Sequence, residues 1–135
     1  MGVVESNSPL STTFNKKEKT MNYIDFNAGN NTYKLRLSTR AIVGLEKQLG
    51  TNPLMIFGTG DRVPTISEMV AVLHASLQQL QHNITMDKAY DIFDAYLNDG
   101  NVTTDFIPVI VDIYKVSGII RDNSKNEDSE ENEKN

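Results

Sequence analysis

The chain has 135 residues, of which 39% are hydrophobic and 23% charged, and its formal net charge is -5. This length accommodates one ordinary globular domain and excludes two large ones. The absence of cysteine from the sequence excludes thiol nucleophiles, disulfides and thiolate metal sites. The acidic balance argues against non-specific binding to nucleic acid, because the average surface repels phosphate.

Membrane insertion and secretion are also disfavoured. No stretch approaches the roughly 18 consecutive apolar residues of a membrane span, and the first residues lack the apolar segment of a secretory signal. We therefore expect a soluble protein of the cytoplasm.

The two ends of the chain differ in composition from the middle. Residues 1–21 are rich in Ser, Thr, Asn and Lys without a hydrophobic period, which predicts a flexible arm or leader. Residues 122–135 contain six carboxylates and no apolar residue, so we expect a disordered acidic tail over 121–135. A single α-rich domain is predicted between them, at 22–120.

The domain is expected to begin with a β-hairpin. Ile24, Phe26 and Ala28 alternate with polar residues, and the same alternation resumes at Tyr33 and Leu35 after a Gly-Asn-Asn turn. Because an isolated hairpin is marginal in water, its apolar face must lie against the following helices or against a neighbouring subunit.

The first two predicted helices follow the hairpin. Ser38 or Thr39 is expected to cap a helix that stops at Gly50. After Pro64, the segment Thr65-Ile66-Ser67-Glu68 offers capping side chains, and an apolar stripe continues from there to Leu80.

Two more helices complete the predicted core. The third begins at Thr85 and ends in the polar run 98–101. The last apolar segment, 106–120, is long enough to be a helix and is capped at Thr103 or Thr104, although its β-branched residues would also suit a buried strand. The predicted fold class is mainly α, a four-helix core with an N-terminal β-hairpin.

A loop between the first two helices is unusually apolar. It contains the run Leu54-Met55-Ile56-Phe57, and loops normally expose their residues. The run is either a lid on the helices of its own subunit or a contact surface for another chain. On the second interpretation the protein-interaction residues include those of the hairpin as well: Leu54, Met55, Ile56, Phe57, Tyr33 and Leu35.

No constellation in the sequence suggests catalysis, a cofactor or a metal. His74 and His82 are eight residues apart, too far for a helical metal pair. Asp87, Asp91 and Asp94 are typical of a solvated helix face, and their charge also disfavours a DNA-reading helix. We therefore expect a protein that is not an enzyme, with no catalytic residue, no cofactor, no metal and no nucleic-acid partner.

Several short segments resemble one known family. The segments are Tyr-Lys-Leu-Arg-Leu at 33–37, Leu-Glu-Lys-Gln-Leu-Gly at 45–50, Asn-Pro-Leu at 52–54, the run from Thr85 to Asp94, and Tyr-Lys-Val-Ser-Gly at 114–118. They are similar to tail assembly chaperones of long-tailed phages or prophages of Gram-positive bacteria. The resemblance extends over about residues 22–120.

The resemblance implies a function. Such a protein binds the tape measure protein, keeps it soluble and hands it over as tail tube subunits assemble around it. It acts in the host cytoplasm, is absent from the mature virion, forms homo-oligomers and often has a longer frameshifted form. The alternatives are a structural phage protein retained in the virion, such as a head-tail connector or tail completion subunit, then a DNA-binding regulator, and last an enzyme.

Overall fold

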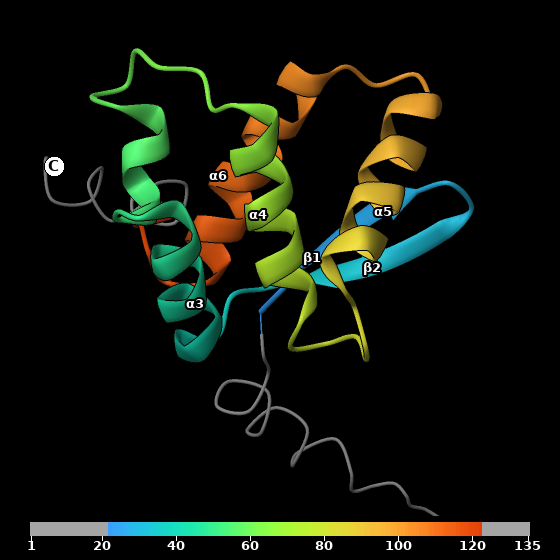
Figure 1. Cartoon of the computed structure of the whole chain (residues 1–135), viewed down its shortest axis with the longest axis horizontal. Coiled ribbons are helices and arrows are strands. Elements are labelled where there is room, and N and C mark those ends of the chain that lie inside the picture. The colour runs from blue at the N-terminus through green and yellow to red at the C-terminus, as the bar shows by residue number, and fades with distance from the viewer. Residues whose placement is uncertain (1–21, 123–135) are drawn as a thin grey trace, which may run out of the picture.

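The computed structural model describes residues 22–122, and the expectations for residues 1–21 and for 123–135 lie outside this part of the chain. The described residues form an antiparallel hairpin followed by four α-helices and two short 3₁₀ helices (Figure 1). The elements are β1 (Ile24–Ala28), β2 (Asn31–Leu35), α3 (Thr39–Leu49), η1 (Pro53–Phe57), α4 (Ile66–Leu77), α5 (Met86–Asn98), η2 (Thr103–Asp105) and α6 (Phe106–Val116). The mainly helical fold with an N-terminal hairpin is confirmed.

The hairpin presents its apolar face to the helices of its own chain. Phe26 pairs with Tyr33 across the ladder, and Ile24 pairs with Leu35. Phe26, Ala28 and Leu35 are buried, whereas the alternate residues of β1 are exposed. Gly29 begins the turn with φ +65°, a conformation that glycine adopts without strain, and its N–H donates to the Asp99 carboxylate beyond α5 at 2.8 Å.

The predicted cap of the last helix at Thr103 or Thr104 is wrong, because these residues form η2 and α6 begins at Phe106 with no side-chain cap hydrogen bond. The capping signals predicted for the other three helices operate as expected. The Ser38 side chain accepts the Ala41 N–H at the start of α3, and Gly50 ends that helix with φ 76°. Thr65 and Glu68 form a complete capping box at the start of α4. The Thr85 hydroxyl accepts the Lys88 N–H at the start of α5.

Helix α4 ends at Leu77, so the predicted continuation of the helix to Leu80 is wrong. Side chains satisfy carbonyl groups where the helix stops. Gln78 Nε2 donates to the His74 carbonyl at 2.8 Å and to the Ile84 carbonyl at 2.9 Å, which directs the chain toward α5.

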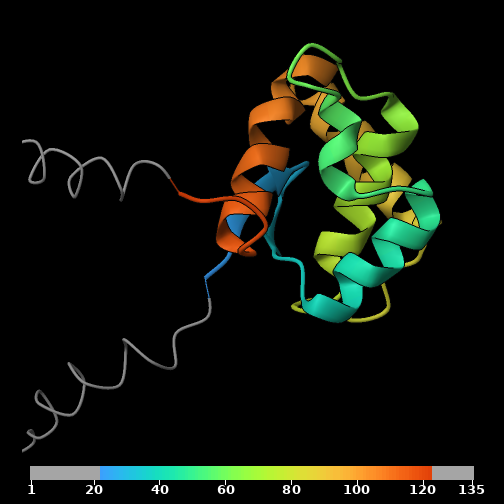
Figure 2. The ribbon, with the colours of Figure 1, turned by 90° about the vertical axis from the view of Figure 1, so that its left-hand side faces the viewer.

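Helix α4 lies at the centre of the molecule, with α3 and α5 on either side of it (Figure 1). The hairpin contacts α4 through β2 and contacts α5 and α6 through β1, and Figure 2 shows it passing between α6 and the other helices. An aromatic cluster joins the hairpin to α5 and α6 through edge-on and tilted ring contacts; its members are Phe26, Phe93, Tyr96 and Phe106. None of the helices that the structure describes is long and apolar enough to cross a membrane.

Arg36 connects the first and last parts of the described chain. Its Nη1 donates to the Asn22 carbonyl at 2.9 Å and to the Val116 carbonyl at 2.7 Å. The neighbouring Leu37 N–H donates to the Ser117 hydroxyl at 2.8 Å. The start of the hairpin is thereby held against the C-terminal end of α6, where a cation also interacts favourably with the helix dipole.

The outer edge of β2 is closed by a side chain instead of a third strand. Gln81 Oε1 accepts the Lys34 N–H at 2.7 Å, and Gln81 Nε2 donates to the Lys34 carbonyl at 2.9 Å. The same Nε2 donates to the Leu77 carbonyl at 2.9 Å. The Gln81 amide therefore makes the pair of hydrogen bonds that an adjoining strand would make with Lys34, and it connects the hairpin to the end of α4.

Replacing Gln81 with leucine removes these bonds while keeping a side chain of similar size. We expect the free energy of unfolding to fall by about 1–2 kcal/mol, since each such bond contributes about 0.5–1.5 kcal/mol and water can solvate part of this edge. Urea denaturation measures the loss, and hydrogen exchange of the Lys34 amide should accelerate. The matched control is Gln79→Leu, because Gln79 is exposed and has no hydrogen-bond partner among the described residues. Equal stability of the two variants would contradict the role of Gln81.

Candidate interaction site

The apolar run after α3 forms the 3₁₀ helix η1. Asn52 caps it by accepting the Leu54 N–H at 2.9 Å, and Pro53 occupies the first position, where a missing N–H costs nothing. The glycines and proline around this apolar run predict a loop or a short turn of helix, and the structure forms the short helix.

The four apolar residues of η1 are not equally accessible. Ile56 is 1% exposed and belongs to the core, while Leu54 and Phe57 are half-buried against it. Met55 is 49% exposed. The segment is therefore mainly a lid on its own subunit, as the first of the two interpretations expects, and Met55 is its most accessible apolar side chain.

The hairpin residues proposed for interaction face inward. Leu35 is 0% exposed and Tyr33 is half-buried against the core, because β2 lies on α4. The expectation that Leu35 contacts another chain is thus corrected: the helices of its own subunit cover it. Tyr33 and Leu35 also have different neighbours from η1, which contacts α3, so the structure does not combine the two groups into one surface.

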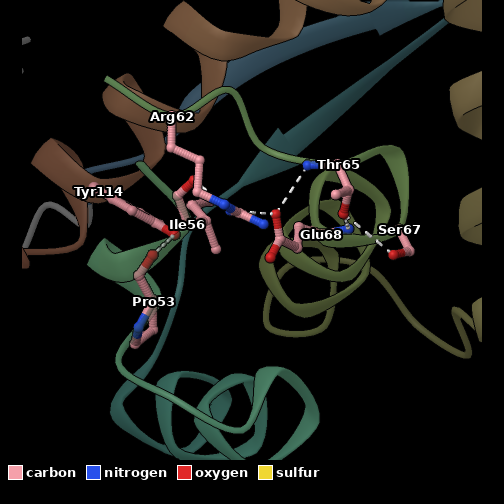
Figure 3. Close-up of polar contacts among 7 residues, drawn as sticks. All are labelled: Pro53, Ile56, Arg62, Thr65, Ser67, Glu68 and Tyr114. Carbon is pink, nitrogen blue, oxygen red and sulfur yellow. Dashed lines mark hydrogen bonds and ion pairs between the residues drawn. The ribbon is translucent and has the colours of Figure 1, made fainter. Parts of the chain in front are cut away.

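Two hydrogen bonds from side chains outside η1 hold it in place, one long-range and one local (Figure 3). The buried Tyr114 hydroxyl of α6 donates to the Pro53 carbonyl at 2.9 Å, and the ring of Phe57 packs edge-on against the Tyr114 ring at 6.2 Å. At the other end, Arg62 Nη1 donates to the Ile56 carbonyl at 2.7 Å. Burial, followed by the negative charge of Glu68, raises the pKa of Tyr114, so its hydroxyl stays protonated and able to donate.

Arg62 also pairs with Glu68, which links η1 to the N-terminus of α4. Arg62 Nη1 lies 2.8 Å from Glu68 Oε1, and the same carboxylate oxygen accepts the Thr65 N–H (Figure 3). Partial burial acts to raise the pKa of Glu68, but the hydrogen bonds from Arg62 and Thr65 outweigh it, and the pKa lies below its usual value. The hydrogen bond to Glu68 raises the pKa of Arg62 in turn.

Three exposed apolar side chains belong to residues that lie next to this polar network in the chain. Val63 is 61% exposed and follows Arg62, Ile66 is 53% exposed and begins α4, and Met55 precedes Ile56. We call these three residues the apolar cluster. Sequence reasoning missed Val63 and Ile66. Ile66 fits the apolar stripe of its helix, so the sequence gives no sign that it is exposed. Val63 is an isolated apolar residue between Arg62 and Pro64, and this isolation could have indicated exposure.

The residues weighed for chemistry are dispersed. His74 is half-buried on α4 and His82 is exposed beyond its end, while Asp87, Asp91 and Asp94 are exposed along α5. Among residues 22–122, no group of three or more His, Asp or Glu residues is placed to hold a metal ion. The surface around η1 is held by hydrogen bonds from Tyr114 and Arg62, and it carries exposed apolar side chains.

Comparison with known proteins identifies a family without a known activity. The model of a family of unknown function, DUF6096, matches residues 14–134, and the chain belongs to this family. No curated protein and no solved structure matches the chain.

Replacing Tyr114 with phenylalanine removes the hydroxyl that donates to the Pro53 carbonyl and connects α6 to η1. We expect the free energy of unfolding to fall by about 0.5–1.5 kcal/mol, the usual net contribution of one hydrogen bond. Chemical denaturation measures the change. Tyr90→Phe is the control, because Tyr90 is an exposed side chain of α5. A Tyr114 variant as stable as the Tyr90 variant would show that the bond to Pro53 does not hold η1.

The lowered pKa of Glu68 predicts a pH-dependent contribution to stability. Its carboxylate stabilises the fold above the unfolded-state pKa of about 4.3, and this contribution disappears as the pH falls through the lower folded-state pKa. Glu68→Gln preserves the capping shape, so we expect it to cost less than about 1 kcal/mol near pH 7 and almost nothing near pH 3. Denaturation at several pH values measures the difference, with exposed Glu46→Gln as control. A constant difference between pH 7 and pH 3 would contradict an electrostatic role.

Proposed function

We propose that the protein is a tail assembly chaperone of a long-tailed phage or prophage of a Gram-positive bacterium. It binds the tape measure protein in the host cytoplasm and keeps it soluble until tail tube subunits assemble around it, and it is itself absent from the mature virion. The sequence resemblance over residues 22–120 supports this function. The structural observation that supports this proposal is the exposure of the apolar cluster beside η1, which hydrogen bonds hold in place.

The apolar cluster suits reversible binding. A tape measure protein is a long helical protein with apolar stripes exposed before assembly, and a surface with a few accessible apolar side chains can cover them. Full burial of one such side chain contributes about 1.5–3 kcal/mol, and these three are already partly buried, so each contact is weak. Several copies along one partner bind strongly together yet can be displaced one at a time.

The charge of the protein suits the same task. With a formal charge of -5, the protein stays well solvated while its apolar cluster is covered by a partner. Self-association of the chaperone along the tape measure protein belongs to this proposal, and the exposed face of the hairpin and the surface around η1 are available for it.

Co-expression with the tape measure candidate of the same phage tests the proposal. We expect the candidate to become soluble and to co-purify with several copies of this protein, and mass spectrometry of finished particles should find the protein missing. Its presence in particles would favour the alternative of a structural subunit, a head-tail connector or tail completion protein. A candidate that stays insoluble beside a freely eluting chain would contradict the chaperone function.

Replacing Met55 with glutamate should weaken this co-purification at least tenfold without unfolding the protein, because Met55 is accessible and a charge opposes burial. The control is Val102→Glu, the same type of change at an exposed valine beside η2. Circular dichroism and thermal denaturation verify the fold of both. Phe57 is unsuitable for this test because its ring packs on Tyr114. Equal solubilisation by the two variants would exclude Met55 from the contact.

A further inference from the structure

A groove runs along the seam between α3 and α4, which lie side by side in Figure 1. Its larger part has a volume of about 450 Å³ and is lined by residues such as Ala41, Gly44 and Gln48 of α3 and His74 and Ala75 of α4. A second hollow of about 310 Å³ continues beyond Gln48, which lines both, toward Ser67 at the start of α4. The two hollows together form an elongated groove, which we call the α3–α4 groove.

Gly44 lines this groove from α3 and has no side chain to fill it. It lies in the interior of α3, where glycine destabilises a helix relative to alanine. Nothing among the described residues requires glycine here, because a Cβ atom at this position would meet none of their atoms within 4 Å. Small residues at a helix surface allow another backbone to approach closely, and Ala41 and Ala75 continue the small-residue lining.

The larger part of the groove also carries a positive charge. The Arg40 side chain lines it and has no ion pair or hydrogen bond with another described residue. The remaining polar lining residues of this part carry hydroxyl, amide or imidazole groups, and none is a carboxylate. The local charge is therefore opposite in sign to the net charge of the chain, and it favours an acidic group on the occupant.

We propose that the α3–α4 groove binds one amphipathic helix, with small apolar residues crossing at Gly44 and a carboxylate directed to Arg40. The dimensions fit: α3 has 11 residues, about 16 Å at 1.5 Å per residue, which faces roughly three turns of a partner helix. Thr65 and Ser67, which flank Ile66 in the chain, line the second hollow. This inference rests on the proposed function where it takes the occupant to be a helix of the tape measure protein.

The first experiment uses a designed helical peptide and does not depend on the tape measure protein. A 20-residue amphipathic peptide carries an Ala/Leu stripe, flanking glutamates and one tryptophan; because this chain contains no tryptophan, the peptide's fluorescence reports its burial directly. Gly44→Met fills the groove, whereas Glu46→Met places the same side chain on an exposed position of α3 outside it. We expect Gly44→Met to weaken binding at least tenfold and Glu46→Met to change it less than twofold.

A charge exchange tests the role of Arg40. Arg40→Glu should reverse the preference between the acidic peptide and an otherwise identical peptide with lysines in place of the glutamates. Circular dichroism confirms that each variant keeps its helical content. Absence of peptide binding to the natural chain, equal binding to the Gly44 and Glu46 variants, or an unchanged preference in Arg40→Glu would overturn the proposal.

Co-expression of the same variants with the tape measure candidate separates this inference from the proposed function. Solubilisation by the natural chain and by Glu46→Met, but not by Gly44→Met, supports both. Equal solubilisation by all three retains the chaperone function and overturns the groove as its binding site. Failure with all three, combined with selective peptide binding, overturns the chaperone function and retains the groove as a helix-binding site.

Discussion

Helix α4 has apolar residues on most of its circumference, and a helix of this kind is stable in water only when other elements cover it. From its fourth residue onward, the side chains from Met69 to Leu73 and from Ala75 to Leu77 are all buried. Covering them requires α3, α5, α6 and the hairpin together, which explains why the hairpin lies against helices and why the core includes every α-helix. The buried Ser76 is accommodated because its hydroxyl donates to the Leu73 carbonyl and its own carbonyl accepts the Arg36 N–H.

Single polar side chains fasten the elements around this core. Gln81 closes the edge of β2, Arg36 joins the start of the hairpin to the end of α6, and Tyr114 and Arg62 fix the two ends of η1. Each supplies a hydrogen-bond donor to a backbone carbonyl group of another segment. The result is a small surface of fixed shape at η1, and a rigid surface loses little conformational entropy when it binds.

The two proposed binding surfaces follow from the same arrangement. The apolar cluster adjoins the Arg62–Glu68 pair along the chain, and the α3–α4 groove begins near the C-terminal end of α4. Helix α3 contacts both α4 and η1, so it borders the groove and the segment that contains Met55.

Much of the local structure was predictable from the sequence. The alternation in the hairpin, the caps at Ser38, Thr65 and Thr85, and the glycine that ends α3 act over a few residues and are visible in the printed chain. The end of α4 was placed too late, because the apolar stripe continues through Leu80 while Gln78 and Gln81 satisfy carbonyl groups where the helix ends.

The candidate site was only partly visible in the sequence. The run from Leu54 to Phe57 marked the right segment, but its sequence could not distinguish the buried Ile56 from the accessible Met55. That distinction depends on the hydrogen bond from Tyr114 to Pro53, two residues that are 61 positions apart. In the same way, Leu35 is buried because β2 packs against α4, which is distant in the chain. The sequence by itself determined where the elements form, because capping and periodicity are local; only the tertiary structure decided which apolar side chains remain exposed, because burial depends on residues distant in the chain.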